Sequence, residues 1–210
     1  LSFYLVAMRS FPAGTGIAPP ISSPALTGNT CLATGPCNIG DVGPAGGVVF
    51  YDAGEHKTWG RYLEAAPVET EGVGLPWKRL TAIDKKRPVY RDVLKVKAQT
   101  QRVLATQIGM GKINTDRIVK IYGRGRYAAR YAQAMVFNGF DDWFLPSKDE
   151  LKLLFNNLAD NSLAGLSNGV YWSSTSSSDT RAWAELMSDG TQGTNFRTSS
   201  FFVRPVRAFK

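Results

Sequence analysis

The stretch DDWFLPSKDELKLLF, residues 141–155, constrains the fold more than any other line of this sequence. Ser147 and Glu150 have the spacing of a capping box, in which the serine oxygen accepts the Glu150 backbone N–H and the carboxylate accepts the serine N–H. Pro146 restricts the residue before it to an extended conformation and so sets the entry to the helix. An apolar stripe at helical spacing follows: Leu151, Leu154, Phe155 and Leu158. The line therefore predicts a helix that starts at Ser147 and packs on a core.

Other patterns predict an α+β domain with long loops. Thr115 is a plausible N-cap for a helix that stops at Gly123, and a second helix is expected from Arg126 to about Phe137. Runs rich in β-branched and aromatic residues predict strands at 47–53, 61–66 and 170–173. Asp189-Gly190 indicates a hairpin with a primed turn, and Pro205 indicates an edge strand or a bulge. The 21 glycines and 11 prolines favour this class over a helical bundle.

The N-terminal region differs in composition from the rest. Residues 1–8 are apolar and predict either a strand docked on a neighbour or the tail of a signal segment. Residues 12–30 are rich in Gly, Pro, Ser and Thr, which is typical of an extended linker or arm. We therefore expect an extended arm or linker over residues 1–37 and a folded binding domain over residues 38–210. No run of about 18 apolar residues occurs, so no membrane span is expected.

The two cysteines, Cys31 and Cys37, flank a Gly-Pro turn. They predict a small disulfide loop and hence an oxidising compartment; the alternative is a pair of free thiols. With His56 as the single histidine, they do not complete a zinc set, and neither a metal nor a cofactor is expected.

The net charge of +8 is concentrated in one segment. Between Lys78 and Arg102 nine basic residues face two acids, which accounts for +7 of the +8. One interpretation is a solvated insertion, at about 78–106, with a half-buried strand or helix near Val89–Val96. The other is a patch for an anionic partner, whose binding should weaken with salt. The candidate ligand residues are Lys85, Lys86, Arg87, Arg91, Lys95 and Lys97. A single tyrosine lies within this segment, so a stacking platform for single-stranded nucleic acid is not favoured.

Catalytic signals are weak. His56 lies in a polar turn. Asp141 and Asp142 lie between a predicted turn and a tryptophan that is predicted to be buried. Neither arrangement supplies a nucleophile with a base or a carboxylate pair across a cleft, so we do not expect an enzyme. The glycine-rich GPAGG before the first strand predicts a turn, because it lacks the glycine spacing of a phosphate-binding loop.

The C-terminal loops offer an alternative binding face that combines aromatic and hydrogen-bonding side chains. Its candidate residues are Trp172, Trp183, Asp189, Asn195 and Arg197. Trp172 and Trp183 could equally be core residues. Arg204 and Arg207 are expected to hold loops or carboxylates in place.

Several motifs in order resemble the Lcl C-terminal domain family, named for a bacterial collagen-like adhesin. They are IGDVGPAGGVVFYDAG, RYLEAAP, GKINTDRIV, DDWFLPSKDELKLL, YWSSTSSSDTRAW and FFVRPVRAF, within residues 38–209. DWFLPSKDEL and VRPVRAF also resemble C-type-lectin-like domains of the formylglycine-generating-enzyme type. That resemblance implies two helices beside a small twisted antiparallel sheet, but not the oxidase, because no cysteine follows Cys37.

The resemblance implies a secreted, cell-surface or virion-surface binding domain. The expected function is an adhesin or receptor-binding module for polysaccharide, sulfated glycan or a host or cell-surface protein. A homo-oligomer, such as a trimer or a filament, is also implied. The alternative is a structural subunit of an extracellular filament or virion, in which residues 1–30 dock on a neighbouring subunit.

Overall fold

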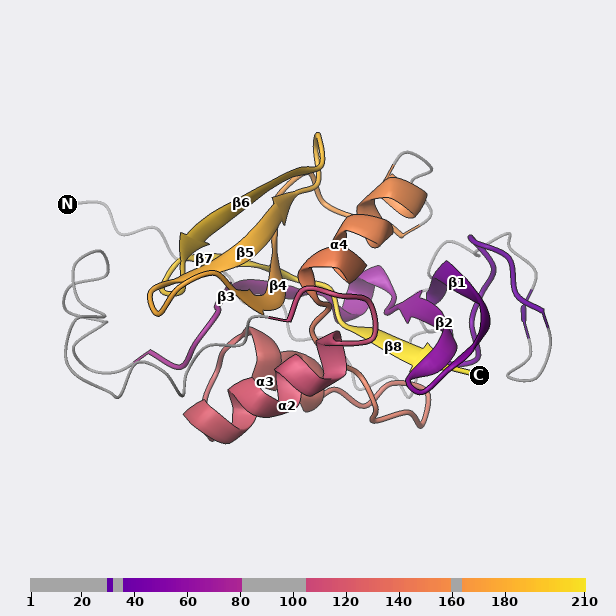
Figure 1. Cartoon of the computed structure of the whole chain (residues 1–210), viewed down its shortest axis with the longest axis horizontal. Coiled ribbons are helices and arrows are strands. Elements are labelled where there is room, and N and C mark those ends of the chain that lie inside the picture. Colours follow the sequence, from indigo (N-terminus) through magenta and orange to yellow (C-terminus); the bar gives the residue numbers. More distant parts are fainter. Residues whose placement is uncertain (1–29, 32–35, 81–104, 160–163) are drawn as a thin grey trace, which may run out of the picture.

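Two β-sheets and three α-helices make up the described part of the chain (Figure 1). The computed structural model describes residues 30–31, 36–80, 105–159 and 164–210. The three-stranded sheet has the order β1 (Val48–Lys57), β2 (Gly60–Ala65), β8 (Val206–Phe209). The five-stranded sheet has the order β3 (Gly72–Pro76), β7 (Ser200–Val203), β4 (Val170–Ser176), β5 (Arg181–Leu186), β6 (Thr191–Phe196).

The chain passes from one sheet to the other between β7 and β8. Two residues, Arg204 and Pro205, separate these strands. Proline has no N–H to donate to a ladder, and Pro205 lies outside both ladders, where its carbonyl accepts the Ala66 N–H at 2.9 Å. Pro205 was predicted to indicate an edge strand or a bulge, but it lies between two strands, where the chain crosses from one sheet to the other.

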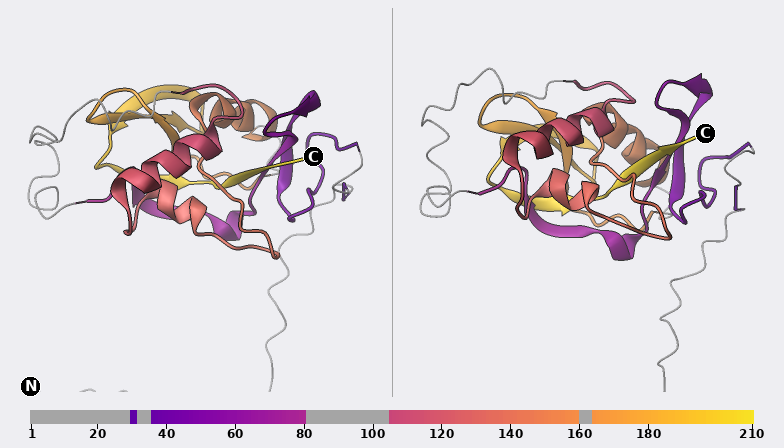
Figure 2. Two further views of the ribbon diagram at one scale, coloured as in Figure 1. Left: turned by 60° about the horizontal axis from the view of Figure 1, so that its bottom comes forward. Right: turned by 90° about the horizontal axis from the view of Figure 1, so that it is seen from below.

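One face of the five-stranded sheet packs against two helices, α2 (Gly111–Tyr122) and α3 (Ala128–Gln133). Figure 2 shows these helices side by side in front of the sheet. Ile118 and the alanines of α3 meet Trp172, Ala182 and Ala184 in this core. The large indole of Trp172 packs in this core together with the small alanines of α3.

The third helix, α4 (Lys148–Leu154), confirms the predicted capping box. The Glu150 N–H donates to Ser147 Oγ at 3.2 Å, and the Ser147 N–H donates to Glu150 Oε2 at 2.7 Å. Leu151, Leu154 and Leu158 pack on residues of both sheets, among them Phe50 and Tyr171. The helix continues into a π-type turn, η3 (Phe155–Ala159); a short 3₁₀ turn, η1 (Val68–Thr70), precedes β3.

Two helix predictions and one turn prediction were wrong in detail. The helix α2 starts at Gly111, because Thr115 is buried inside it and exchanges hydrogen bonds with the backbone of Leu145. The helix α3 is shorter than predicted. The hairpin at Asp189-Gly190 is confirmed, but four residues, 187–190, connect its strands and of these only Gly190 has a positive φ, so the turn is not a two-residue primed turn.

The α+β class is confirmed, but the predicted architecture needs correction. The described residues contain three α-helices and two sheets instead of two helices and one sheet. The five-stranded sheet is also mixed, because β4 and β7 are parallel at Tyr171 and Phe202. The lectin-like assignment stays a prediction.

Candidate functional site

A row of exposed cations runs along α2. Arg117 and Lys120 are three residues apart on α2 and share one side of it, and Arg124 follows just after the helix, beyond the terminating Gly123. All three are exposed, and none forms an ion pair with a described acidic residue. We call these three residues the α2 basic row. The exposed acid of this helix, Asp116, is already engaged by Lys112 at 3.5 Å and by the Gln133 amide at 2.8 Å.

The two ends of the basic segment lie at the two ends of α2. Arg79 lies beside Gly125, just after the helix, where a Cβ on that glycine would come within 3.1 Å of the arginine side chain. At the other end, the Ala105 carbonyl accepts the side-chain amide of Asn114, near the start of the helix, at 2.7 Å. The described chain thus breaks off near the C-terminal end of α2 and resumes near its N-terminal end.

The predicted polyanion residues lie within that segment and outside the described residues: Lys85, Lys86, Arg87, Arg91, Lys95 and Lys97. Their role stays a prediction, as does any strand or helix near residues 89–96. The α2 basic row was not predicted as a site. Its signal was present in the sequence, because basic residues recur at helical spacing after position 112, but their exposure depends on which face α2 buries.

The predicted loop face is divided by the structure. Trp172 is fully buried and donates its indole N–H to the Leu75 carbonyl at 2.9 Å. Arg197 is also fully buried: its guanidinium stacks 4.5 Å from the Trp77 ring and donates to the Tyr122 hydroxyl at 3.2 Å. Both were wrong as ligand candidates, because neither side chain reaches the surface. Their hydrogen-bonding groups are satisfied by the core.

The other three candidates lie on or near the hairpin of β5 and β6. Trp183 is half-buried, with the Lys148 ammonium 4.8 Å from its ring. Asn195 is half-exposed on β6, opposite Ala182. Asp189 is exposed in the turn, where it accepts the Thr191 N–H at 2.8 Å and this bond lowers the pKa of its carboxyl. Their role in binding stays a prediction.

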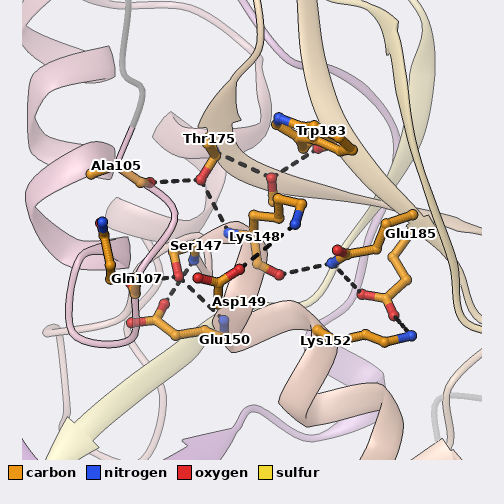
Figure 3. Close-up of polar contacts among 12 residues, drawn as sticks. Ala105, Gln107, Ser147, Lys148, Asp149, Glu150, Lys152, Thr175, Trp183 and Glu185 are labelled. Carbon is orange, nitrogen blue, oxygen red and sulfur yellow. Dashed lines mark hydrogen bonds and ion pairs between the residues drawn. The ribbon is translucent and has the colours of Figure 1, made fainter.

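The charged groups beside Trp183 are paired with one another (Figure 3). The Glu185 carboxylate is buried, lies 3.3 Å from the Lys152 ammonium, and accepts the Gln192 amide at 3.1 Å. Burial raises the pKa of Glu185, while these two neighbours act in the opposite direction. Lys148 lies 3.8 Å from Asp149. The charges of this cluster are neutralised by one another. The cluster therefore attracts an external anion less strongly than the α2 basic row does.

Glu150 contributes more than the predicted capping box. Its Oε1 also accepts the Gly109 N–H at 2.7 Å and the Gly111 N–H at 3.3 Å, so one carboxyl joins α4 to the start of α2. The side chain is fully buried, and burial raises the pKa of Glu150 to about 7 against the opposing effect of these hydrogen bonds. The sequence showed the partner three residues away but not those about forty residues away.

The disulfide between Cys31 and Cys37 is present. It is buried against Val49, Tyr62 and Phe209 of the three-stranded sheet. The Cys37 N–H also donates to the Tyr62 hydroxyl at 3.3 Å. The disulfide therefore fastens the segment that precedes β1 to the folded domain.

The residues considered for catalysis have ordinary surroundings. His56 and Asp141 are exposed, and Asp142 accepts both Nε and Nη2 of Arg207 at 2.7 and 2.9 Å. Within the described ranges, no three His, Cys, Asp or Glu side chains gather closely enough to hold a metal ion. No helix in the same ranges has the length and apolar character needed to cross a membrane.

Comparisons with known proteins identify the family. No curated protein sequence matches this chain. A solved structure of a fimbrial protein from Bacteroides ovatus aligns with a TM-score of 0.46 and 15% identity, over 75% of this chain and 37% of that one. The chain thus spans less than two thirds of that protein. The Lcl C-terminal domain matches residues 68–207, more than half of the 210 residues, and this chain therefore belongs to the Lcl C-terminal domain family.

Proposed function

We propose that this chain is a non-enzymatic extracellular domain that binds anionic polysaccharide, such as a sulfated glycan, along α2. The observation that carries the proposal is the α2 basic row, whose cations have no described acidic partner. Exposed cations of this kind attract a polyanion by releasing its counterions. The basic segment contributes further cations to the same chain, and the described residues that flank it lie near the two ends of α2.

Several separate cations suit a polyanion better than a single small anion. Arg117 and Lys120 are about 4.5 Å apart along the helix axis, and Arg124 follows beyond the C-terminal end of the helix. A polymer with repeated negative groups can contact more of these cations at once than a small anion can.

The disulfide supports the extracellular part of the proposal. Cys31–Cys37 forms and persists in an oxidising environment such as the cell exterior. Family membership agrees with a surface role. An adhesin or receptor-binding module on a bacterial, host or virion surface is the corresponding biological setting.

The test is the affinity for heparin as a function of salt. We expect Arg117→Ala, Lys120→Ala and Arg124→Ala in one chain to weaken binding and to lower the slope of log Kd against log salt by about two to three. A matched control removes three cations from the three-stranded sheet and the C-terminus, through Lys57→Ala, Arg61→Ala and Lys210→Ala. A second variant, Lys85→Ala, Lys86→Ala and Arg87→Ala, tests the basic segment.

The outcomes separate local binding from net charge. A loss of heparin affinity in the α2 variant, with little change in the affinity of the control, supports the proposal. Equal loss in both would assign the binding to overall charge. No loss in either the α2 or the segment variant would remove the polyanion proposal.

The structural-subunit alternative depends on residues 1–30, of which 1–29 lie outside the described residues. It stays a prediction that size-exclusion mass, with and without that segment, can check. A monomer unchanged by the truncation would contradict it.

A further inference from the structure

The outer edge of β6 is open to a further strand. In Figure 1, β6 lies at the border of the five-stranded sheet, with β5 as its neighbour on the other side. The two strands pair over six consecutive residues without a register shift. The sequence of β6, TQGTNF, contains neither a proline nor a charged residue. Bulges, prolines and charges are the usual means by which proteins protect an edge strand, and β6 itself has none of them.

The other three edge strands of the two described sheets are protected. β3 ends at Pro76 and has a register shift against β7, and its Val73 carbonyl accepts the Arg126 guanidinium at 3.3 Å. β1 has two register shifts, and the backbone of the segment that precedes it is hydrogen-bonded to Val49. The outer side of β8 exchanges backbone hydrogen bonds with Phe144 at 2.8 and 2.9 Å. The contrast singles out β6.

The backbone groups of alternate residues in β6 point away from β5. Just beyond the strand, the Arg197 N–H donates to the Thr180 carbonyl at 2.9 Å, and in an antiparallel ladder such pairs recur at every second residue. The N–H and C=O groups of Gln192, Thr194 and Phe196 therefore face outward. In the part of the chain that the structure describes, these three N–H groups have no hydrogen-bond partner.

The outward carbonyls can also accept further bonds. The Thr194 carbonyl accepts Arg181 Nη1 at 3.0 Å, and the Phe196 carbonyl accepts the Ser199 N–H at 2.8 Å. A carbonyl oxygen has two lone pairs, so each of them can accept one more N–H. The edge thus offers donors and acceptors in the alternating order that an extended backbone matches.

We propose that β6 pairs with β6 of a second copy of this chain, antiparallel and about a two-fold axis at Thr194. In this register the two Thr194 residues exchange both of their backbone hydrogen bonds, and Gln192 of each copy lies opposite Phe196 of the other. Each outward group then has a partner. A second copy fits this edge because the uncharged strand places no like charges opposite each other, although the chain carries a net charge of +8.

The pairing has a consequence for the α2 basic row. The two-fold axis of such a pair is perpendicular to the sheet, so the side covered by α2 and α3 faces the same way in both copies. A paired molecule therefore presents two α2 basic rows to one polyanion, which raises the affinity through avidity. This consequence rests on the proposed function, whereas the strand pairing does not.

Sedimentation of the whole chain at increasing concentration tests the pairing. The average mass should rise from that of one chain toward that of two above about 0.1 mM, because a single strand pair forms a small interface. Over the same range, the hydrogen-exchange protection of the Gln192, Thr194 and Phe196 amides should rise several-fold. The Gly193 amide, which already faces β5, should change little.

Substitutions at the axis test the register. Thr194→Lys and Thr194→Asp each place like charges directly opposite each other, so each variant alone should stay monomeric where the wild type pairs. An equimolar mixture should pair again, because lysine then faces aspartate. Thr191→Lys is the matched control. It adds the same charge, but in this register it lies about 20 Å from its counterpart and should pair as the wild type does.

A mass of one chain at all concentrations, with unchanged protection of the outward amides, would overturn the proposal. This outcome needs no variant, so the test remains decisive if a variant at position 194 fails to fold. Pairing that persists in both folded variants would assign the self-association to another segment, such as residues 1–30, and would equally overturn it.

The avidity step is measured with heparin at chain concentrations above about 0.1 mM. Thr194→Lys should bind several-fold more weakly than Thr191→Lys, which has the same net charge. Equal binding of these two variants, with pairing lost in only one of them, contradicts the avidity step. Binding that is absent in both contradicts the proposed function, while the sedimentation data still decide the pairing.

Discussion

The chain uses its cations in two opposite ways, and the contrast separates architecture from function. Arg197, Arg204 and Arg207 are buried and fully engaged by the protein. The α2 basic row is exposed and has no described acidic partner. Both groups contribute equally to the net charge of +8. The charge total therefore does not indicate which arginines are available to a ligand.

Two of the buried arginines, Arg204 and Arg207, lie where the chain crosses between the two sheets. Arg204, between β7 and β8, donates to Glu71 Oε2 at 2.7 Å and to the carbonyls of Ala66 and Ala164 at 2.9 and 2.7 Å. Arg207 donates to Glu64 Oε1 at 2.7 Å and to Asp142. The expectation that these two residues hold loops and carboxylates is confirmed.

The largest expected effect is on Arg204. Arg204→Met should lower the free energy of unfolding by about 3–5 kcal/mol, because it leaves Glu71 buried without its cation and removes the donor to the carbonyls of Ala66, Ala164 and Gly165. Urea denaturation measures this loss. Adding Glu71→Gln should recover part of it, since removing both charges costs less than removing one. A loss below 1 kcal/mol would mean that the buried and exposed arginines do not differ as described.

A smaller effect is expected from the pH dependence of stability. Burial raises the pKa of Glu150 from an ordinary 4.5 to about 7, so its folded form holds the proton more tightly than its unfolded form. This contribution to stability is fully present below pH 4.5 and is lost as the pH rises to about 7. The total corresponds to roughly 3 kcal/mol.

The measurement is the difference in unfolding free energy between the wild type and Glu150→Gln at several pH values. This difference should fall as the pH rises from 4.5 to 7. Glu55→Gln is the control: Lys57 lowers the pKa of this exposed carboxyl, so it stays ionised over the same range. A flat difference for Glu150 would contradict the predicted cost of ionising it in place.

The smallest effect on stability is expected for the α2 basic row. Replacing Arg117, Lys120 and Arg124 by alanine should change the free energy of unfolding by no more than about 0.5 kcal/mol for each residue, because exposed cations without close partners contribute little and alanine favours a helix. Thermal denaturation checks this alongside the heparin measurement. A large destabilisation would show that the row has a structural role and would weaken its assignment as a binding surface.

The sequence predicted local features well and distant partners poorly. The hydrogen bonds between Ser147 and Glu150 could be predicted because the two residues are three positions apart. The Cys31–Cys37 disulfide could be predicted because its residues are also close in the sequence. The Glu150 bonds to Gly109 and Gly111 span about forty residues and carry no local signal. Trp172 and Arg197 were candidates because aromatic and charged residues in loop-rich stretches often bind ligands. Both side chains are buried in the folded protein, which excludes them as ligand contacts. Their burial depends on the packing of elements that are distant in the sequence.

By itself the sequence determined the α+β class, the cap and apolar stripe of α4 and the location of the basic segment, because each depends on neighbouring residues or on backbone geometry. The tertiary structure alone decided which cations are paired inside and which face water. It also placed the described residues that flank the basic segment near the two ends of α2 and enclosed Glu150 between two helices. Pairing and desolvation are relations between residues far apart in the chain, so they exist only once the chain has folded.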